Sequence, residues 1–280
     1  MKQMSGDLHT HSTYSDGALN VRWLPHLAAA AGLTHLAVSD HDTLLSVEYA
    51  RQNDGACGVT LIPAVELTGF DERRGRRVHL LCYAPNPTDE LRAFCEHMKQ
   101  ARNAAAEQSL AAVEQRFPQF SREFALELSR DAGVCFKGHI MRVLLEFGYT
   151  DGLYRDLYKQ LSKEGVLKGP EYVPVEQVLD IARRAGAAIV LAHPSVYRTM
   201  DLFAELAAAG MIDGVEIDHP RNTEEDKAVL REAARKYGLI VTGGSDFHGL
   251  HASRPVTLGS HRTDAENIVR ILELSAARKS

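Results

Sequence analysis

The sequence predicts an α/β protein with a parallel sheet, either open or closed into a barrel, and an inserted helical subdomain. From Leu19 onward, the chain repeats an alanine-rich amphipathic segment, a glycine and a short apolar run. This rhythm is typical of helix–turn–strand units, which assemble into parallel sheets. A long stretch rich in helix formers interrupts the rhythm, and a histidine, aspartate or glutamate follows nearly every predicted strand.

Four helix–strand units show the rhythm most clearly. In each, a glycine follows the helix, where the backbone commonly turns into the left-handed region. The predicted helices and the strands that follow them cover residues 24–31 and 36–39, 175–185 and 188–192, 202–209 and 214–217, and 226–237 and 239–242. Repeated units of this kind favour parallel pairing of the strands.

Residues 91–168 interrupt this rhythm. Glutamate, glutamine, alanine, arginine and leucine recur there at helical spacing, and no convincing strand run is present. The sequence therefore predicts three parts. Residues 1–101 and 169–280 form the α/β domain, and residues 102–168 form a helical subdomain inserted into it.

Composition and charge exclude several classes of protein. The 280 residues are 45% hydrophobic and 25% charged, which suits a globular chain with a substantial core. The net charge of -5 argues against stable binding to duplex nucleic acid, which usually needs a basic surface. No apolar stretch is long enough to span a membrane, and the first residues contain no apolar signal region, so we expect a cytoplasmic protein.

The four cysteines are spaced irregularly, without a CxxC motif, in a chain too long to depend on a disulfide scaffold. None lies in a polar cluster at a strand end, so they are poor candidates for metal ligands. We therefore expect reduced cysteines that serve in packing: Cys57, Cys82, Cys95 and Cys135.

Polar side chains follow most of the predicted strands directly. They are His41, His193, the segment 216–219, and Asp246 with His248. Active sites of α/β folds assemble at the carboxyl ends of the strands. We therefore expect these side chains to lie together at one end of the sheet.

The strongest local signal is Asp7-Leu8-His9-Thr10-His11. In an extended segment His9 and His11 project from the same face, and two imidazoles placed in this way can bind one ion. Taken alone, the motif fits two surface histidines equally well. Further potential ligands along the chain favour a metal site: Asp16, His41, Glu66, His79, His193, Asp246 and His248.

Two of these residues lie in apolar surroundings. Glu66 follows the apolar residues 61–65, where a carboxylate is costly unless it is paired, hydrogen-bonded or bound to a metal. His79 lies between apolar residues, and here a neutral histidine bonded to a backbone carbonyl is an equal alternative. Imidazole and carboxylate ligands without thiolate fit manganese, iron or zinc better than a soft copper site.

Four motifs carry a family resemblance. They are Asp7-x-His9-x-His11 with Ser15-Asp16-Gly17, Ser39-Asp40-His41-Asp42, Ala192-His193-Pro194 and Gly244-Ser245-Asp246-x-His248. In this combination the chain resembles the PHP (polymerase and histidinol phosphatase) family within the amidohydrolase-like barrels. The resemblance implies a distorted seven-stranded (β/α) barrel that holds three divalent ions, with manganese favoured and iron or zinc as alternatives.

The same resemblance implies which residues hold each ion. The first ion would be held by His9, His11, Glu66 and Asp246, the second by Glu66 as a bridge with His79 and His193, and the third by Asp16, His41 and His248. Asp246 would also take part in catalysis. A third ion favours an oxyanion substrate, so the implied reaction is hydrolysis of a phosphate ester.

Within the family, the chain resembles the small enzymes that carry a helical insertion and hydrolyse 3′,5′-nucleoside bisphosphates. Some of these enzymes also act on short RNA from the 5′ end. The resemblance therefore implies removal of the 3′-phosphate from a nucleotide, possible activity on short 5′-phosphorylated RNA, and an insertion that serves as a substrate lid.

Several residues are predicted to contact the substrate. The resemblance places Lys137, His139 and Arg142 of the insertion beside it. His219, at a predicted strand end, is expected to contact phosphate or to donate a proton to the leaving group. The remaining candidates for phosphate contacts are Arg22, Arg198 and Arg221. For several of these cations a solvated surface position is the plainer interpretation.

Other functions remain open. Hydrolysis of histidinol phosphate or another small phosphomonoester is one alternative, and a broader phosphodiesterase acting on RNA ends is another. A helical lid suits a nucleotide better than a small amino alcohol. Hydrolysis of C–N bonds shares the paired histidines of the first motif, but the predicted third-ion set argues against it. The non-enzyme alternative is a metal-binding structural or proofreading module of a polymerase, and the presence of all nine ligand positions argues against that.

Overall fold

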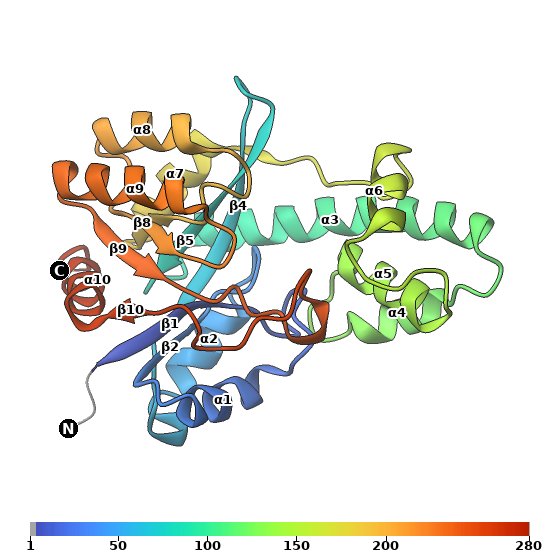
Figure 1. Cartoon of the computed structure of the whole chain (residues 1–280), viewed down its shortest axis with the longest axis horizontal. Helices are drawn as coiled ribbons and strands as arrows, with labels where there is room; N and C mark the ends of the chain where they lie inside the picture. The colour runs from blue at the N-terminus through green and yellow to red at the C-terminus, as the bar shows by residue number, and fades with distance from the viewer. Residues whose placement is uncertain (1–3, 280) are drawn as a thin grey trace.

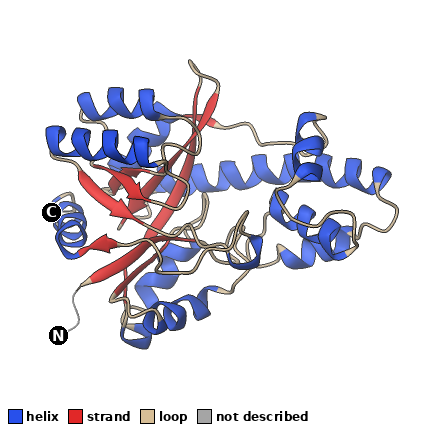
Figure 2. Ribbon diagram, in the orientation of Figure 1, coloured by secondary structure: helices blue, strands red, loops and turns tan. Residues whose placement is uncertain are grey.

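Two β-sheets with flanking helices form the body of the protein, and a helical lobe lies beside it (Figures 1 and 2). The computed structural model describes residues 4–279. The smaller sheet has the order β10-β1-β2-β3 and comprises β10 (Thr263–Asp264), β1 (Ser5–Thr10), β2 (His35–Val38) and β3 (Thr60–Leu61). The larger sheet has the order β6-β4-β5-β7-β8-β9 and comprises β6 (Val173–Pro174), β4 (Ala64–Asp71), β5 (Arg76–Tyr83), β7 (Ala188–Leu191), β8 (Gly214–Asp218) and β9 (Ile240–Gly243).

The helices of the body follow the strands in the expected alternation. They are α1 (Leu24–Ala30), α2 (Leu45–Gln52), α7 (Val175–Arg184), α8 (Met200–Ala208), α9 (Glu224–Tyr237) and α10 (Ala265–Ala277), with short 3₁₀ turns at η1 (Val21–Trp23), η2 (Ala56–Gly58) and η3 (Gly249–His251). The four predicted helix–strand units are confirmed, with boundaries that differ by at most two residues. Helix α9 shows why, because Thr223 caps its first turn and Gly238 ends it with a φ of 65°.

The expectation of a parallel sheet is only partly correct. Strands β1, β2 and β3 are parallel, as are β7, β8 and β9, but β4 pairs with β5 and β5 with β7 in antiparallel fashion. Four residues ending in Gly75, at a φ of 65°, join β4 to β5. So short a connection permits only an antiparallel hairpin, since parallel neighbours need a longer crossover.

Closure into a barrel stays a prediction. Among residues 4–279 no continuous ladder joins the two sheets, which meet at single parallel bridges between Thr10 and Phe247 and between His41 and Glu66. Each bridge contains a predicted ligand or lies next to one. The sheets therefore approach each other where the candidate site lies.

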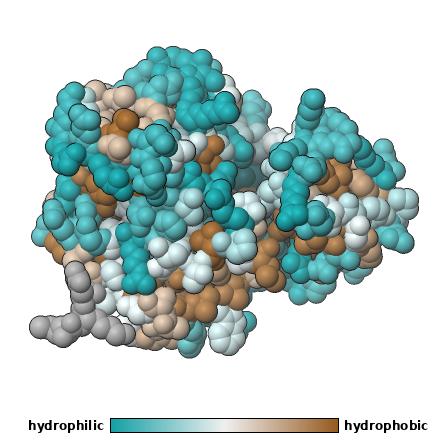
Figure 3. Space-filling model, in the orientation of Figure 1, coloured by the Kyte–Doolittle hydropathy of each residue, from teal (hydrophilic) through white to brown (hydrophobic). Residues whose placement is uncertain are grey.

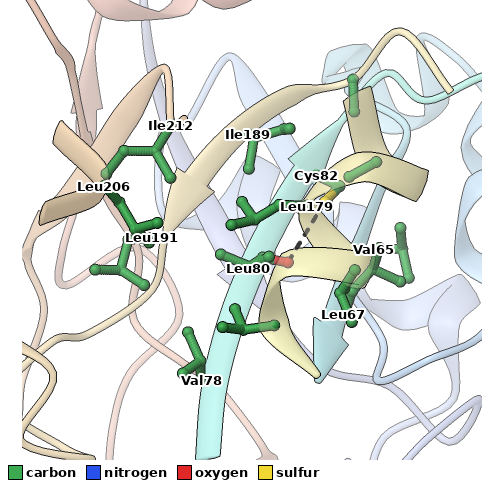
Figure 4. Packing of buried hydrophobic residues seen from close by; sticks show 14 of the residues in the cluster. Val65, Leu67, Val78, Leu80, Cys82, Leu179, Ile189, Leu191, Leu206 and Ile212 are labelled. Atoms are coloured by element: carbon green, nitrogen blue, oxygen red, sulfur yellow. Dashed lines mark hydrogen bonds between the residues drawn. The ribbon is translucent and has the colours of Figure 1, made fainter. Parts of the chain in front are cut away.

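The main hydrophobic core lies on one face of the larger sheet, beneath α7, α8, α9 and the first half of α3 (Asp89–Arg116). Strand β5 sends Val78, Leu80 and Cys82 into this core, where they pack beside Leu179 of α7 (Figure 4). Side chains alternate along a strand, so His79 faces the other side. Burial of one face of β5 thus fixes the direction of the histidine.

The lobe consists of the second half of α3 together with α4 (Arg122–Leu128), α5 (Lys137–Glu146) and α6 (Asp156–Lys163) (Figure 1). It has its own hydrophobic cluster, to which α3 contributes Leu110 and Val113. The first half of the same helix contributes Leu91 and Met98 to the core of the body. The predicted boundary between residues 101 and 102 therefore falls inside one continuous helix.

The cysteines only partly match the expectation. All four are free thiols, and Cys82, Cys95 and Cys135 are buried, but Cys57 is exposed, so a packing role is wrong for that residue. The face of the molecule in Figure 3 is mostly hydrophilic, with hydrophobic residues in smaller patches. Within residues 4–279, no helix combines the length and apolar character that crossing a membrane requires.

Candidate metal centre

All nine predicted ligand residues come together in one cluster of overlapping groups. The candidate ligand atoms within each group lie within 4.8 Å of one another, and the groups are His11, Asp16, His41 and His248; His9, Glu66 and His193; His9, His11 and Asp246; and His41, Glu66 and His79. The residues lie at or just after strands of both sheets. Segments far apart in the sequence therefore meet at one end of the body.

The carboxylate of Glu66 is the centre of the cluster, and five imidazole nitrogens surround it. Oε1 lies 2.8 Å from His79 Nδ1 and 3.1 Å from His193 Nε2, and Oε2 lies 3.2 Å from His9 Nε2, His11 Nε2 and His41 Nδ1. The Glu66 side chain is fully buried. A buried carboxylate with both oxygens facing imidazole nitrogens is suited to metal ligation.

Two further carboxylates complete the cluster on its more open side. Asp246 Oδ1 lies 3.3 Å from His11 Nε2 and 3.4 Å from His9 Nε2. Asp16 Oδ1 lies 3.2 Å from His248 Nε2 and 3.8 Å from His11 Nδ1. His11 thus lies between the two carboxylates, and its ring stacks on that of His248 at 4.1 Å between centroids.

The donor atoms of the cluster are arranged for binding divalent ions, and not for hydrogen bonds with one another. His11 Nε2 and His41 Nδ1 are buried and make no hydrogen bond, although each lies 3.2 Å from Glu66 Oε2. His9 Nδ1 faces Glu216 Oε1 at 2.9 Å, which places the proton of a neutral ring there and directs the Nε2 lone pair at carboxylate oxygens. Facing lone pairs repel unless a cation lies between them, so the set is suited to metal binding.

Burial and neighbouring charge act in opposite directions on the carboxylates. Burial disfavours the charged form of Glu66, but the surrounding histidines, His41 first, hold its pKa well below the usual range. Burial likewise opposes ionisation of Asp16 and Asp246, and His248 is the main neighbour that holds each pKa low. All three carboxylates are therefore ionised at neutral pH, the form that metal ligation needs.

Two residues at the end of β8, Glu216 and His219, contact side chains of the cluster. Glu216 is fully buried, and its Oε2 accepts the backbone N–H of His193 at 3.0 Å while Oε1 accepts from His9. His219 is also fully buried, and its Nε2 lies 3.4 Å from Asp246 Oδ2. Both residues form a further candidate group with His9. The sequence analysis did not select Glu216, because nothing in its segment separates a metal ligand from the partner of a ligand.

The backbone at the cluster is closely packed. A Cβ at Gly244 would lie 2.2 Å from the Cβ of His9 and 2.6 Å from its backbone nitrogen, so only glycine lets the end of β9 approach β1. Asp246, two residues later, has a φ of 52°, and His193 has a φ of 25°. Left-handed conformations at residues other than glycine are uncommon and concentrate at functional sites.

A cavity of about 490 Å³ opens from the cluster toward the lobe. Seven of the nine predicted ligands line one end of it, and residues of α3, α5 and α6 line the other. Of the predicted substrate contacts, the structure brings Lys137 and Arg221 to its wall. Burial, followed by the charges of Arg77 and Arg102, lowers the pKa of Lys137 to about 8.

The other predicted substrate contacts do not line this cavity. Arg22 is exposed and donates to Asn20, Arg142 pairs with Glu146 one helical turn away, and Arg198 is exposed. His139 is buried, and its Nδ1 accepts the backbone N–H of Phe136 at the start of α5. Burial lowers the pKa of His139 to about 4, so its ring is neutral and suits a helix cap better than a phosphate contact.

Three arginines that line the cavity were not among the predicted substrate contacts: Arg77, Arg102 and Arg254. Arg102 is paired with Asp42, and its guanidinium lies 5.0 Å from the centre of the Phe136 ring. Arg77 lies two residues before His79 on β5, and this alternation was the signal that could have found it.

Buried imidazoles and carboxylates lie together at the ends of the strands. This arrangement is typical of one class of protein, the metal-dependent hydrolases. A family model described as the PHP domain matches residues 7–167. The chain belongs to the PHP domain family, and it is a hydrolase of phosphoric ester bonds.

Curated relatives share most of their length with this chain. A phosphoribosyl 1,2-cyclic phosphate 1,2-diphosphodiesterase of Eggerthella lenta is 34% identical over 249 residues, covering 88% of this chain and 95% of the relative. The 5′-3′ exoribonuclease Rnm of Escherichia coli is 29% identical over 254 residues, covering 86% and 84%. A 3′,5′-nucleoside bisphosphate phosphatase of Chromobacterium violaceum is 27% identical over 250 residues, covering 86% of each.

The fold also matches a solved structure. A protein from Bifidobacterium adolescentis, described as a metal-dependent phosphoesterase, superposes with a TM-score of 0.84 at 25% identity, and the match covers 96% of both chains. The likeness extends over the body and the lobe together.

Proposed function

We propose that this protein removes the 3′-phosphate from 3′,5′-nucleoside bisphosphates, such as adenosine 3′,5′-bisphosphate, and releases inorganic phosphate. The observation that carries the proposal is the cavity, which joins the predicted metal ligands to cations and aromatic rings. The ligand cluster alone would suit any phosphate ester. Phe136, Tyr154 and Tyr158 of the lobe add flat surfaces on which a nucleobase can stack.

The nine predicted ligands would hold three divalent ions in this proposal, with Mn²⁺ favoured over Fe²⁺ and Zn²⁺. Bound ions of this kind activate a water molecule as nucleophile and neutralise charge on the phosphoryl oxygens. Glu66 would bridge two ions, because each of its oxygens faces a different set of imidazoles. Asp246 would both hold an ion and orient His219 through its other oxygen.

His219 is our candidate for the residue that donates a hydrogen bond to the leaving group. Its Nδ1 accepts the backbone N–H of Arg221 at 3.1 Å, so the proton of the neutral ring lies on Nε2. Burial, the main influence, lowers the pKa of His219, so the ring is neutral at neutral pH and its Nε2–H can donate to the leaving oxygen. The helical lobe would act as the substrate lid. The similarity to the 5′-3′ exoribonuclease of Escherichia coli supports short 5′-phosphorylated RNA as a further substrate.

A second candidate substrate is phosphoribosyl 1,2-cyclic phosphate. The specific observation in its favour is the relative from Eggerthella lenta, which is 34% identical over 88% of this chain. Both candidate substrates carry two phosphate groups on one ribose. Only the nucleotide carries a base, so only the nucleotide would stack on the aromatic rings of the lobe.

The test is product release by protein that has been stripped with a chelator and reloaded with Mn²⁺, measured both as inorganic phosphate and, by chromatography, as the nucleotide or sugar phosphate formed. The substrates are adenosine 3′,5′-bisphosphate, AMP, phosphoribosyl 1,2-cyclic phosphate, histidinol phosphate and a short 5′-phosphorylated RNA. We expect the highest kcat/KM for the bisphosphate. A preference for the cyclic phosphate or for histidinol phosphate would overturn the substrate assignment, and no release from any of the five would refute a phosphatase of small phosphate esters.

Two variants control this assay. Asp16→Asn removes a predicted ligand charge with little change in shape, and we expect it to lose at least about 100-fold in kcat. Asp180→Asn makes the same replacement on the exposed face of α7, where the aspartate pairs only with Arg184, and should match the parent protein.

A further inference from the structure

Among residues 4–279, three arginines line the cavity without an ion pair to a carboxylate: Arg77, Arg221 and Arg254. Arg77 is the one on β5, the strand that also carries the predicted ligand His79. Arg74 and Arg76, its neighbours in sequence, pair with Asp71 and Asp201. Arg102, on α3, pairs with Asp42. Arg77 lines the cavity, and among residues 4–279 it forms no ion pair with a carboxylate.

The surroundings of Arg77 hold it in place. Its guanidinium carbon lies 4.7 Å from the centre of the Tyr197 ring, in a cation–π contact. The same ring lies 4.7 Å from the ring of His79 and 5.6 Å from that of His193. Tyr197 therefore separates Arg77 from the metal cluster and keeps the guanidinium at the edge of it.

The strand sets the spacing between Arg77 and the cluster. Arg77 and His79 are two residues apart on β5, so they face the same side at a separation of roughly 6.6 Å along the strand. Val78 between them is fully buried in the core, which fixes this register.

From this geometry we propose that Arg77 binds the phosphate group that is not hydrolysed, while the metal cluster takes the phosphate that is. The proposal rests on the proposed function and deepens it, because it makes the substrate class a ribose with two phosphates. A guanidinium can donate two parallel hydrogen bonds to a phosphate. Arg77 hydrogen-bonds to Tyr172, but no carboxylate among residues 4–279 competes with a phosphate for its charge. Lys137, also without an ion pair among residues 4–279, lines the same cavity and adds positive charge.

The test compares two substrates that differ only in the second phosphate, adenosine 3′,5′-bisphosphate and adenosine 3′-monophosphate. We expect Arg77→Gln to raise KM for the bisphosphate about 10- to 100-fold, with kcat nearly unchanged. For the monophosphate, KM should change less than about twofold. Arg77→Lys keeps the positive charge but cannot donate two parallel hydrogen bonds, so it should give an intermediate KM for the bisphosphate.

Arg76→Gln is the matched control, since Arg76 is adjacent on β5 but pairs with Asp201 outside the cavity. It should leave both KM values unchanged. An equal effect of Arg77→Gln on both substrates, or no effect on either, would overturn the proposal. Melting temperatures of the variants separate a folding defect from a binding defect.

A binding measurement keeps this proposal distinct from the proposed function. Calorimetry of the metal-depleted protein with the same two nucleotides should show tighter binding of the bisphosphate, and Arg77→Gln should abolish that difference. If the parent protein hydrolyses neither nucleotide but keeps the binding preference, the phosphatase assignment fails and the Arg77 site stands. If the metal-depleted protein binds both nucleotides equally, the Arg77 site fails.

Discussion

Replacing Glu216 with glutamine should weaken metal binding without disturbing the fold. Glu216 accepts a hydrogen bond from His9 Nδ1 at 2.9 Å and one from the backbone of His193 at 3.0 Å. The glutamine carbonyl can still accept from His193, but its amide donates to His9 Nδ1. The ring of His9 would then carry its proton on Nε2, which faces Glu66 and Asp246 and would no longer offer a lone pair to an ion.

The structure sets the size of this effect. A buried hydrogen bond to a charged group contributes about 1.5–3 kcal/mol, and loss of such a partner to a ligating histidine typically weakens metal affinity about 10- to 100-fold. Titration of the metal-depleted variant with Mn²⁺, followed by calorimetry and by activity, should show this shift in half-saturation. The melting temperature in chelator should stay close to that of the parent protein.

Glu232→Gln is the control, because Glu232 is exposed on α9. Equal Mn²⁺ affinities for Glu216→Gln, Glu232→Gln and the parent would refute the role of Glu216 in setting the tautomer of His9. Loss of melting temperature in chelator without a change in affinity would make Glu216 a structural residue only.

Three further outcomes follow from the structure. Gly244→Ala should lower the free energy of unfolding by about 1–3 kcal/mol or more in urea, because its Cβ would overlap His9, whereas Gly169→Ala, with open space around it, should be nearly neutral. Burial lowers the pKa of Lys137 to about 8, so its side chain is cationic below that pH and neutral above it. KM for the bisphosphate should therefore rise as the pH passes about 8, and Lys137→Met should remove this pH dependence. Removing the metal with a chelator should lower the melting temperature, since an ion present at 100 times its Kd stabilises the folded state by about 2.7 kcal/mol, and Asp16→Asn should shrink that difference.

Much of the fold follows from local sequence, and the four helix–Gly–strand units are the clearest example. The hairpin of β4 and β5 was missed because both strands are apolar runs, and only the four-residue turn between them reveals that they are antiparallel. The helical stretch after residue 91 was visible by composition. Its boundary with the body was not, since α3 continues through residue 101 without a change of pattern.

The residues of the candidate site were also only partly predictable from the sequence. The alternation of His9 and His11 and the polar residues after strands predict a cluster, because strand ends must meet at one edge of a sheet. Arg77 and Glu216 depend instead on which partners the fold supplies. The alternation along β5 places Arg77 on the side of His79, but only the fold shows that Arg76 pairs with Asp201 while Arg77 lines the cavity. It likewise shows that Arg221 lines the cavity and Arg22 does not. Such differences are set by tertiary contacts, which a single sequence does not display.

The continuous helix α3 joins the lobe to the body. Its 28 residues extend about 42 Å, anchored at one end in the core of the body and at the other in the core of the lobe. One helix therefore belongs to both hydrophobic cores, and its residues also line the cavity. The lid of the proposed site is thus attached to the body by a continuous helix, and not by a loop alone.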